Sequence, residues 1–119
     1  MTKHGDTIYV SRFPPFDAET REIIDAPIER QTELVLEQMK HYVETAGSSL
    51  DQALKCNVYC TSVETLARVN EIYAHDFRDN PPARIFLVMP GWPSRFDIEI
   101  DCIAAIKAPK EAEVCPCSR

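Results

Sequence analysis

The sequence predicts a single α+β domain with the element order ββαβαββ, in which two helices pack on one face of a mixed sheet. Two long segments of the 119-residue chain repeat apolar residues at helical spacing. Shorter segments alternate apolar and polar residues with a period of two, which is typical of strands with one buried face. Clusters of Pro, Gly and Asn separate these segments and predict the turns.

Two strands and a turn are predicted at the N-terminus. Residues 7–11 are mostly β-branched or aromatic, which favours a strand. Pro14 and Pro15 follow, and because proline does not fit a central strand, they predict a turn over residues 13–17. Residues 22–24 (Glu-Ile-Ile) favour a return strand, which would complete a hairpin.

The first helix is predicted over residues 28–46. Pro27 lies near the first helical position, where its missing N–H is not needed, and Gly47 can adopt the left-handed conformation that ends a helix. The apolar residues at helical spacing are Ile28, Leu34, Val35, Met39, Tyr42, Val43 and Ala46.

A strand over residues 54–60 and a second helix over residues 62–78 follow. The strand alternates apolar and polar residues, and Thr61 and Glu64 have the spacing of a capping box at the start of the helix. One residue of the helix's inward stripe, Asn70, is polar where an apolar residue is expected. The stripe consists of Val63, Leu66, Ala67, Asn70, Tyr73, Ala74 and Phe77.

Two more strands are predicted over residues 84–89 and 96–106, joined by a Pro- and Gly-containing loop that includes Trp92. One face of the last strand is apolar throughout. The other face begins with carboxylates and ends with Ile103 and Ala105, which are too apolar to remain in water. We therefore expect self-association to cover that face.

Composition limits the function. Apolar residues are 45% and charged residues 27% of the chain, which is typical of a globular protein and excludes a disordered one. The net charge of -6 argues against a general nucleic-acid binder and against docking on anionic lipid. We expect residues 1–108 to form the domain, residues 109–119 to form a flexible tail, and the location to be cytoplasmic.

The five cysteines do not predict a disulfide framework. Cys56 and Cys60 lie on one face of a predicted strand with Val58, so we interpret them as small buried apolar residues. Cys115 and Cys117 lie in the predicted tail and lack the four-ligand spacing of a structural zinc site.

The sequence contains no metal motif, phosphate-binding loop or nucleophile elbow. Arg84 begins a predicted strand and offers a planar fork for a carboxylate, or else forms a salt bridge with Asp97, Glu99 or Asp101. Glu99 could activate water, or else lie on a solvated strand face. Asn70 could hold a ligand, or else bond a loop.

Seven short motifs occur in order over residues 8–106, and together they resemble the Rid family, also called the YjgF or L-PSP endoribonuclease-like family. The motifs are Ile8-Tyr9-Val10-Ser11, Pro15 with Asp17-Ala18-Glu19-Thr20, Gln31-Thr32, Ala46-Gly47-Ser48-Ser49-Leu50, Val69-Asn70-Glu71-Ile72-Tyr73, Pro82-Ala83-Arg84 and Ile98-Glu99-Ile100.

The resemblance implies a chorismate-mutase-like fold, assembled as a homotrimer with the sheets lining its centre and the sites between subunits. It also implies a deaminase that hydrolyses enamines or imines of the 2-aminoacrylate and 2-iminobutanoate type to a keto acid and ammonia. Arg84 would bind the substrate carboxylate, Glu99 would orient the attacking water, and Ser11 and Asn70 would shape the site. The resemblance implies no cofactor and no metal.

Three departures from the family pattern affect the substrate. The usual N-terminal segment with its site tyrosine is absent, Arg12 follows Ser11 where glycine is usual, and Phe86 replaces a frequent cysteine. Arg12 would add charge to the site or else point to solvent, and Phe86 would add bulk. These changes favour a larger enamine, such as an aminomuconate-like acid. The alternatives are a non-catalytic carboxylate-binding or regulatory protein and, less favoured by the charge, a ribonuclease.

Overall fold

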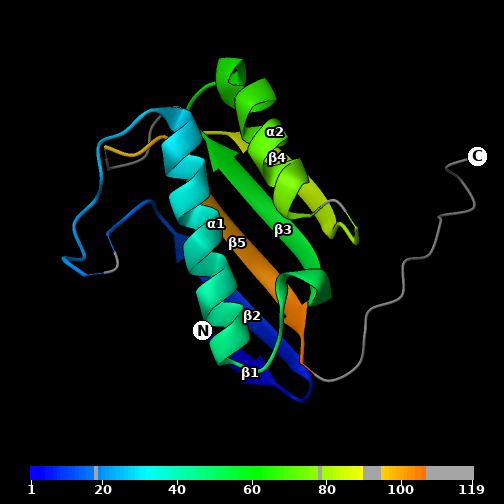
Figure 1. The fold of residues 1–119 in the computed structure, drawn as a ribbon. Helices are drawn as coiled ribbons and strands as arrows, with labels where there is room; N and C mark the ends of the chain where they lie inside the picture. Colours follow the sequence, from blue (N-terminus) through cyan, green and yellow to red (C-terminus); the bar gives the residue numbers. More distant parts are fainter. Residues whose placement is uncertain (18, 78, 90–94, 107–119) are drawn as a thin grey trace, which may run out of the picture.

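The structure is a computed structural model that describes residues 1–17, 19–77, 79–89 and 95–106 (Figure 1). Its strands and α-helices, in chain order, are β1 (Thr2–His4), β2 (Thr7–Phe13), α1 (Ile28–Thr45), β3 (Ala53–Cys60), α2 (Leu66–Asp76), β4 (Ala83–Val88) and β5 (Ile98–Ala105). Short 3-10 turns at Leu50–Gln52 and Val63–Thr65 precede β3 and α2.

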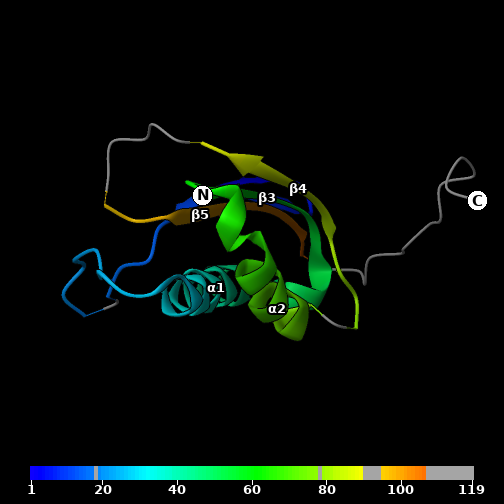
Figure 2. The same ribbon diagram turned by 90° about the horizontal axis from the view of Figure 1, so that it is seen from above.

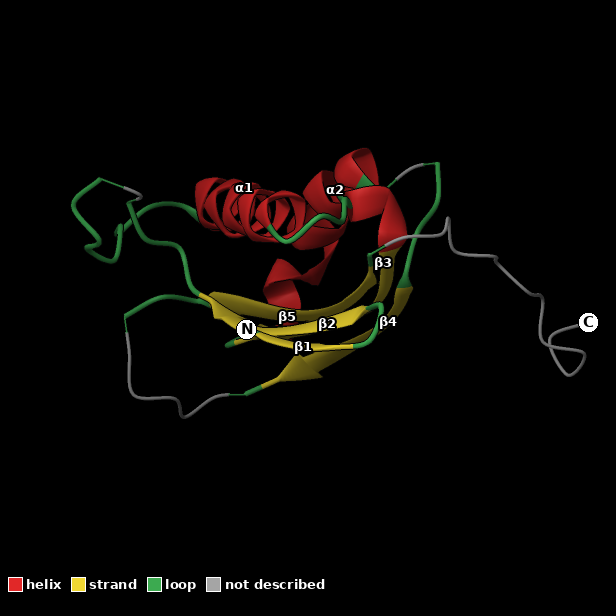
Figure 3. Cartoon of the chain, turned by 90° about the horizontal axis from the view of Figure 1, so that it is seen from below, coloured by secondary structure: helices red, strands yellow, loops and turns green. Residues whose placement is uncertain are grey.

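The five strands form one mixed sheet in the order β1-β2-β5-β3-β4. β4 runs parallel to β3, and the other neighbours are antiparallel. Figure 2 and Figure 3 show α1 and α2 packed side by side on one face of this sheet. The predicted class, two helices on one face of a mixed sheet, is confirmed.

The N-terminal hairpin differs from the prediction. It is formed by β1 and β2, which turn at Gly5 with a φ of 59°. The predicted return strand over residues 22–24 is wrong, because only a single bridge joins Phe16 to Ile23 there. Pro14 and Pro15 lie in this segment, and prolines lack the N–H groups that a continued ladder needs. The order ββαβαββ is therefore correct. The predicted strand over residues 7–11 is β2, and its hairpin partner is β1 rather than residues 22–24.

The first helix agrees with the prediction at both ends. Pro27 stands at the N-terminal cap position, and Gly47 adopts a φ of 91° directly after the helix. The Ser48 N–H donates to the Val43 carbonyl at 2.7 Å, which closes the C-terminal turn. Most of the residues that repeat at helical spacing are buried, as the periodicity predicts.

The second helix begins later than predicted, after the 3-10 turn. Ser62, rather than Thr61, caps this turn by accepting a hydrogen bond from the Glu64 N–H at 3.1 Å. A 3-10 turn has about 3.0 residues per turn instead of 3.6, so it changes the angular phase of the residues that follow. The inward stripe is accordingly Val69, Tyr73 and Phe77, whereas the predicted members Val63, Ala67 and Ala74 are exposed.

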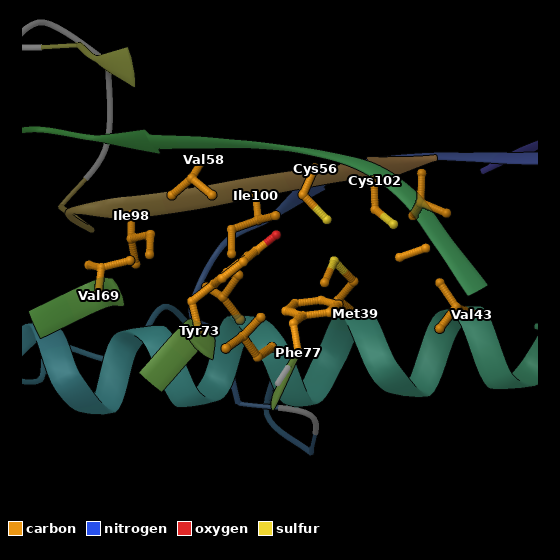
Figure 4. Close-up of a cluster of buried hydrophobic side chains, with 14 of the residues drawn as sticks. Met39, Val43, Cys56, Val58, Val69, Tyr73, Phe77, Ile98, Ile100 and Cys102 are labelled. Carbon is orange, nitrogen blue, oxygen red and sulfur yellow. The ribbon is translucent and has the colours of Figure 1, made fainter. Parts of the chain in front are cut away.

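The core lies between the helices and the sheet (Figure 4). The buried side chains on the sheet side alternate along β5 and β3, as the predicted strand periodicity requires. Cys56, Cys60 and Cys102 are buried thiols that form no disulfide, which confirms that Cys56 and Cys60 are small buried residues of the core. The core residues labelled in Figure 4 are Met39, Val43, Cys56, Val58, Val69, Tyr73, Phe77, Ile98, Ile100 and Cys102.

The face of the sheet opposite the helices, which we call the open face, carries large apolar side chains. Tyr9 of β2 is 46% exposed, and Ile85 and Leu87 of β4 are 45% and 40% exposed. Ile103 of β5 pairs with Tyr9 on this face. Coverage of the open face by self-association stays a prediction.

Several predictions lie outside the described residues: Trp92, Cys115, Cys117 and the flexible tail over residues 109–119. Among the helices that the structure describes, none is both long and apolar enough to span a bilayer.

Candidate functional site

Arg84 is fixed by two residues of α2. Its partner in the strand register is Cys56, whose side chain lies in the core, so the Arg84 side chain leaves the sheet on the helix side. The guanidinium NH1 donates to the Asn70 side-chain oxygen at 2.5 Å. The guanidinium carbon lies 4.7 Å from the centroid of the Tyr73 ring. Residues three apart share one face of a helix, which is how Asn70 and Tyr73 reach the same guanidinium.

This arrangement leaves Arg84 exposed and oriented. A guanidinium has five N–H donors in a fixed plane, so donors remain for a carboxylate beside the hydrogen bond to Asn70. Arg84 forms no ion pair within the described part of the chain. The salt-bridge alternative for Arg84 and the loop-bonding alternative for Asn70 are therefore not observed there, because the two side chains bond each other.

Phe86 lies beside Arg84. It is two residues along β4 and therefore on the same side of the sheet, where it is half-buried and packs against the core. The structure thus brings three of the predicted site residues together on the helix side: Arg84, Asn70 and Phe86.

Glu99 and Ser11 lie on the open face instead. Glu99 stands between the buried residues Ile98 and Ile100 in β5, so its side chain points away from the helices. Ser11 of β2 is exposed and lines a shallow hollow on this face together with Tyr9 and Asp101. Arg12 lies in β2, and its side chain is outside what the structure describes. Within one chain, Arg84 and Glu99 therefore leave the sheet on opposite faces.

A hydrogen-bonded cluster on the open face was not predicted. The Asp101 carboxylate accepts from the Asn57 side-chain amide at 2.7 Å and from the Tyr59 hydroxyl at 2.9 Å. Burial raises the pKa of Tyr59, and the hydrogen bond to Asp101 adds to this effect. The sequence did contain a signal, because positions 57 and 59 are polar on one face of a predicted strand, and positions 99 and 101 are polar on one face of another. The sequence did not indicate that these two strands are neighbours.

Tyr73 was predicted only as a core residue. Its ring packs in the core with the hydroxyl directed toward the sheet (Figure 4). Arg84 lies over the ring. Burial raises the pKa of the Tyr73 hydroxyl well above its ordinary value, so the side chain stays neutral. The sequence signal that could have indicated its contact with Arg84 was a tyrosine one helical turn after Asn70, ahead of a strand that begins with arginine.

Among the described residues, no three His, Cys, Asp or Glu side chains are grouped so as to hold a metal ion. On the helix side of the sheet, the oriented Arg84 guanidinium can bind a carboxylate. The open face offers carboxylate and hydroxyl groups instead.

Comparison with known proteins places these residues in a familiar fold. A model of the family "Endoribonuclease L-PSP" matches residues 1–106. A RutC family protein of Pyrococcus abyssi is 36% identical over 102 residues, which cover 86% of this chain and 80% of the relative. A RutC family protein of Saccharolobus solfataricus is 38% identical over 102 residues, covering 86% and 81%.

Solved structures of similar proteins have the same fold as this chain. RidA from an Antarctic Psychrobacter species superposes with a TM-score of 0.83 at 33% identity, covering 88% of this chain and 85% of that one. TdcF of E. coli, solved with bound serine, superposes with a TM-score of 0.80 at 29% identity, covering 87% and 84%.

Proposed function

The chain belongs to the endoribonuclease L-PSP family, also called the Rid family, and on that premise we propose that it hydrolyses reactive enamines or imines of small carboxylic acids. The products are a keto acid and ammonia. The observation that carries this proposal is the Arg84 guanidinium, which Asn70 and Tyr73 orient while leaving it exposed. The serine bound to the related TdcF, a small amino acid with a carboxylate, supports the same substrate class.

In the proposed reaction Arg84 binds the substrate carboxylate through two parallel N–H donors. An enamine is first protonated at carbon to give the imine. Water then adds to the imine carbon, and the resulting carbinolamine loses ammonia to leave the keto acid. Glu99 would orient this water and carry its proton to the departing nitrogen. Because the imine carbon is already electrophilic, orientation and modest acid–base help are sufficient, and no cofactor is needed.

The proposed site requires two copies of the chain. Arg84, Asn70 and Phe86 lie on the helix side of the sheet, whereas Glu99 and Ser11 lie on the open face. A second copy that places its open face against β4 would bring both groups to one cleft. We therefore include in the proposal a homotrimer with its sites between subunits, in which the exposed apolar residues of the open face are buried.

Substrate size and location complete the proposal. Phe86 adds an aromatic wall beside Arg84, and Arg12 adds positive charge to β2, so a larger enamine such as an aminomuconate-like acid is included as a substrate. The described cysteines Cys56, Cys60 and Cys102 form no disulfide, which agrees with the proposed reducing, cytoplasmic location.

The test measures deamination of 2-aminoacrylate and 2-iminobutanoate, generated in the assay by a dehydratase. We expect the protein to accelerate hydrolysis over the spontaneous rate, and Arg84→Ala to abolish the acceleration. Arg68→Ala is the matched control, because Arg68 is an exposed arginine of α2 that pairs with Glu29. Acceleration that survives in Arg84→Ala would refute the proposed role of Arg84.

A second candidate is a non-catalytic protein that binds small carboxylates. The position of Glu99 on the opposite face from Arg84 favours it, since one chain alone offers the guanidinium without the carboxylate. This candidate predicts saturable binding of L-serine or 2-ketobutyrate by calorimetry, lost in Arg84→Ala, with no acceleration of imine hydrolysis.

A further inference from the structure

A cavity of about 670 Å³ lies between α1 and the chain that follows β2. Residues 14–24 form an irregular hairpin that stands beside α1, on the side away from α2 (Figure 1). We call this cavity the hairpin pocket. Its apolar walls include Phe16, Ile23 and Leu34, and its rim includes Arg21, His41 and Tyr42. The volume falls in the range of pockets that bind small organic molecules.

The outer wall of the hairpin pocket is built by specific hydrogen bonds. The Asp17 N–H donates to the Glu22 carbonyl, and the Ile24 N–H donates to the Pro15 carbonyl, both at 2.9 Å. The Asp17 carboxylate accepts from the N–H groups of two residues at the hairpin tip. These hydrogen bonds join the two arms of the hairpin to each other and to its tip.

Gln38 attaches the hairpin to α1. Its side-chain amide donates to the carbonyls of Pro14 and Phe16, both at 3.0 Å. The Gln38 side chain also lines the pocket and is only 8% exposed. Its oxygen Oε1 is buried and accepts no hydrogen bond within the described part of the chain. Gln38 therefore serves to hold the hairpin against α1.

Arg21 is the arginine among the described residues that line the pocket. Glu37 also lines the pocket, and it shares the Arg30 guanidinium, at 3.5 Å, with Glu33, at 3.0 Å. The Arg21 side chain forms no ion pair among the described residues. Arg21 has a φ of 60°, which residues other than glycine rarely adopt, and its N–H donates to the Asp17 carbonyl at 2.8 Å. Arg21 thus lines an aromatic-walled pocket with a guanidinium that has no ion-pair partner among the described residues.

We propose that the hairpin pocket is a second ligand site, which binds a small aromatic carboxylate independently of the Arg84 cluster. The ring would lie between the apolar wall of the hairpin and Tyr42, and the carboxylate would face the Arg21 guanidinium. The site is separate because none of the described residues that line it belongs to α2 or β4, the elements that carry Asn70 and Arg84.

The test titrates the full-length, ¹⁵N-labelled protein with 2-naphthoate and with its neutral counterpart 2-naphthylmethanol. We expect saturable amide shifts in residues 14–24 and 34–42, and binding of the anion about fivefold tighter than binding of the alcohol. Arg21→Gln should weaken naphthoate binding by about fivefold and leave the alcohol unaffected. Tyr42→Ala should weaken both probes.

Two controls test the location. Arg68→Gln removes the same charge from α2, outside the pocket, and Arg84→Gln removes it from the proposed catalytic cluster. Both variants should keep the naphthoate-induced shifts of the residues that line the hairpin pocket. The proposal is overturned if no saturable shifts occur, if the shifts cluster around Asn70 and Arg84, or if both probes bind equally well. Because the readout is binding, failure of the proposed deaminase activity would not alter this result.

Discussion

At the scale of single residues, Tyr73 has two roles at once. Its ring fills the core between α2 and β3 (Figure 4). The Arg84 guanidinium carbon lies 4.7 Å from the centroid of this ring. A cation over an aromatic face is attracted by the ring's negative quadrupole, with an energy of roughly 0.5–2 kcal/mol that grows as water is excluded. Tyr73 is therefore a positioning residue for substrate binding in the proposed reaction.

We expect Tyr73→Leu to raise KM for the imine substrate by about fivefold, with a smaller change in kcat, because a displaced Arg84 binds the carboxylate less well. Tyr73→Phe keeps the aromatic face and should keep KM. The measurement is steady-state kinetics of all three proteins, with stability checked by urea unfolding. Equal KM values for the Leu and Phe variants would contradict the positioning role.

Cys60 links burial to alkaline stability. The thiol lies in the core at the end of β3, and burial raises its pKa from an ordinary 9.0 to about 11. Because the folded pKa lies above the unfolded one, this contribution to the free energy of unfolding is fully present below pH 9 and is lost as the pH rises through 11.

We expect the wild type, kept reduced, to lose about 2 kcal/mol more of its free energy of unfolding between pH 8 and pH 11 than Cys60→Ala does. The variant will start from a lower stability, because it leaves a small cavity, so the comparison concerns the slope with pH rather than the absolute value. Urea unfolding of both proteins at several pH values measures the two slopes. Parallel slopes for the two proteins would show that Cys60 does not titrate in this range.

At the scale of elements, Asp97 joins three parts of the fold. Its carboxylate accepts from Gln31 of α1 at 3.1 Å and from Thr61, just after β3, at 3.0 Å, and its N–H donates to the Gln31 side-chain oxygen at 2.8 Å. Gln31 is buried and also donates to the Ala26 carbonyl at 2.7 Å. One side chain thus fixes the start of α1 relative to the start of β5.

We expect Gln31→Leu to lower the free energy of unfolding by about 2–3 kcal/mol, because it leaves the Asp97 N–H and the Ala26 carbonyl without their partners. Lys40→Leu, an exposed position of the same helix, should change it by less than about 0.5 kcal/mol. Chemical unfolding of both variants makes the comparison. A loss no larger than that of Lys40→Leu would mean that water replaces the Gln31 contacts.

Elements with a strong local signal could be predicted from the sequence. The first helix ends within one residue of its predicted bounds, because apolar periodicity, Pro27 and Gly47 all indicate the same helix. β1 was missed, since its three exposed residues carry no periodicity and are ordered by pairing with β2. The start of α2 was misplaced because Thr61 bonds Asp97, a tertiary contact, instead of capping the helix.

The candidate site was also predictable only in part, because part of it depends on tertiary contacts between elements. Arg84 was identified from a motif, Asn70 as a polar residue in an apolar stripe, and Phe86 as a departure from the family pattern. The structure brings the three together. The separation of Glu99 from Arg84 follows from strand register, which the sequence pattern of a single strand does not specify. The Asp101 cluster likewise depends on which strands are neighbours.

At the scale of the whole molecule, the sheet is covered by helices on one face only (Figure 2). On the open face, Tyr9, Ile85 and Leu87 expose large apolar side chains, and the edge strand β4 carries two of them. Apolar side chains gathered on one face are typical of surfaces that associate. The proposed homotrimer would bury them against copies of the same chain.

We expect the wild type to sediment as a trimer, and Leu87→Lys to shift the population toward monomer, because a buried unpaired charge opposes association. Val63→Lys is the control, since Val63 is 64% exposed but belongs to the 3-10 turn before α2 rather than to the sheet. Analytical ultracentrifugation over a range of concentrations measures the difference. A wild type that is monomeric at all concentrations would contradict the trimer.

The strongest test of the assembled site uses two inactive variants. If Arg84 and Glu99 of one site come from different subunits, Arg84→Ala and Glu99→Ala are each inactive alone but complement each other in mixed trimers. After joint unfolding and refolding at equal amounts, each site receives an intact Arg84 with a chance of one half and an intact Glu99 with the same chance. About one quarter of wild-type activity should therefore return, as cyclic symmetry requires.

The matched control mixes Arg84→Ala with the double variant that carries both substitutions, and this mixture contains no intact Arg84 and should stay inactive. Native mass spectrometry with one isotopically labelled partner verifies that mixed trimers have formed. Mixed trimers without activity would place both residues of a working site in the same chain, which the opposite directions of Arg84 and Glu99 across the sheet argue against. Recovery would show that the sheet of one subunit completes the cleft of the next.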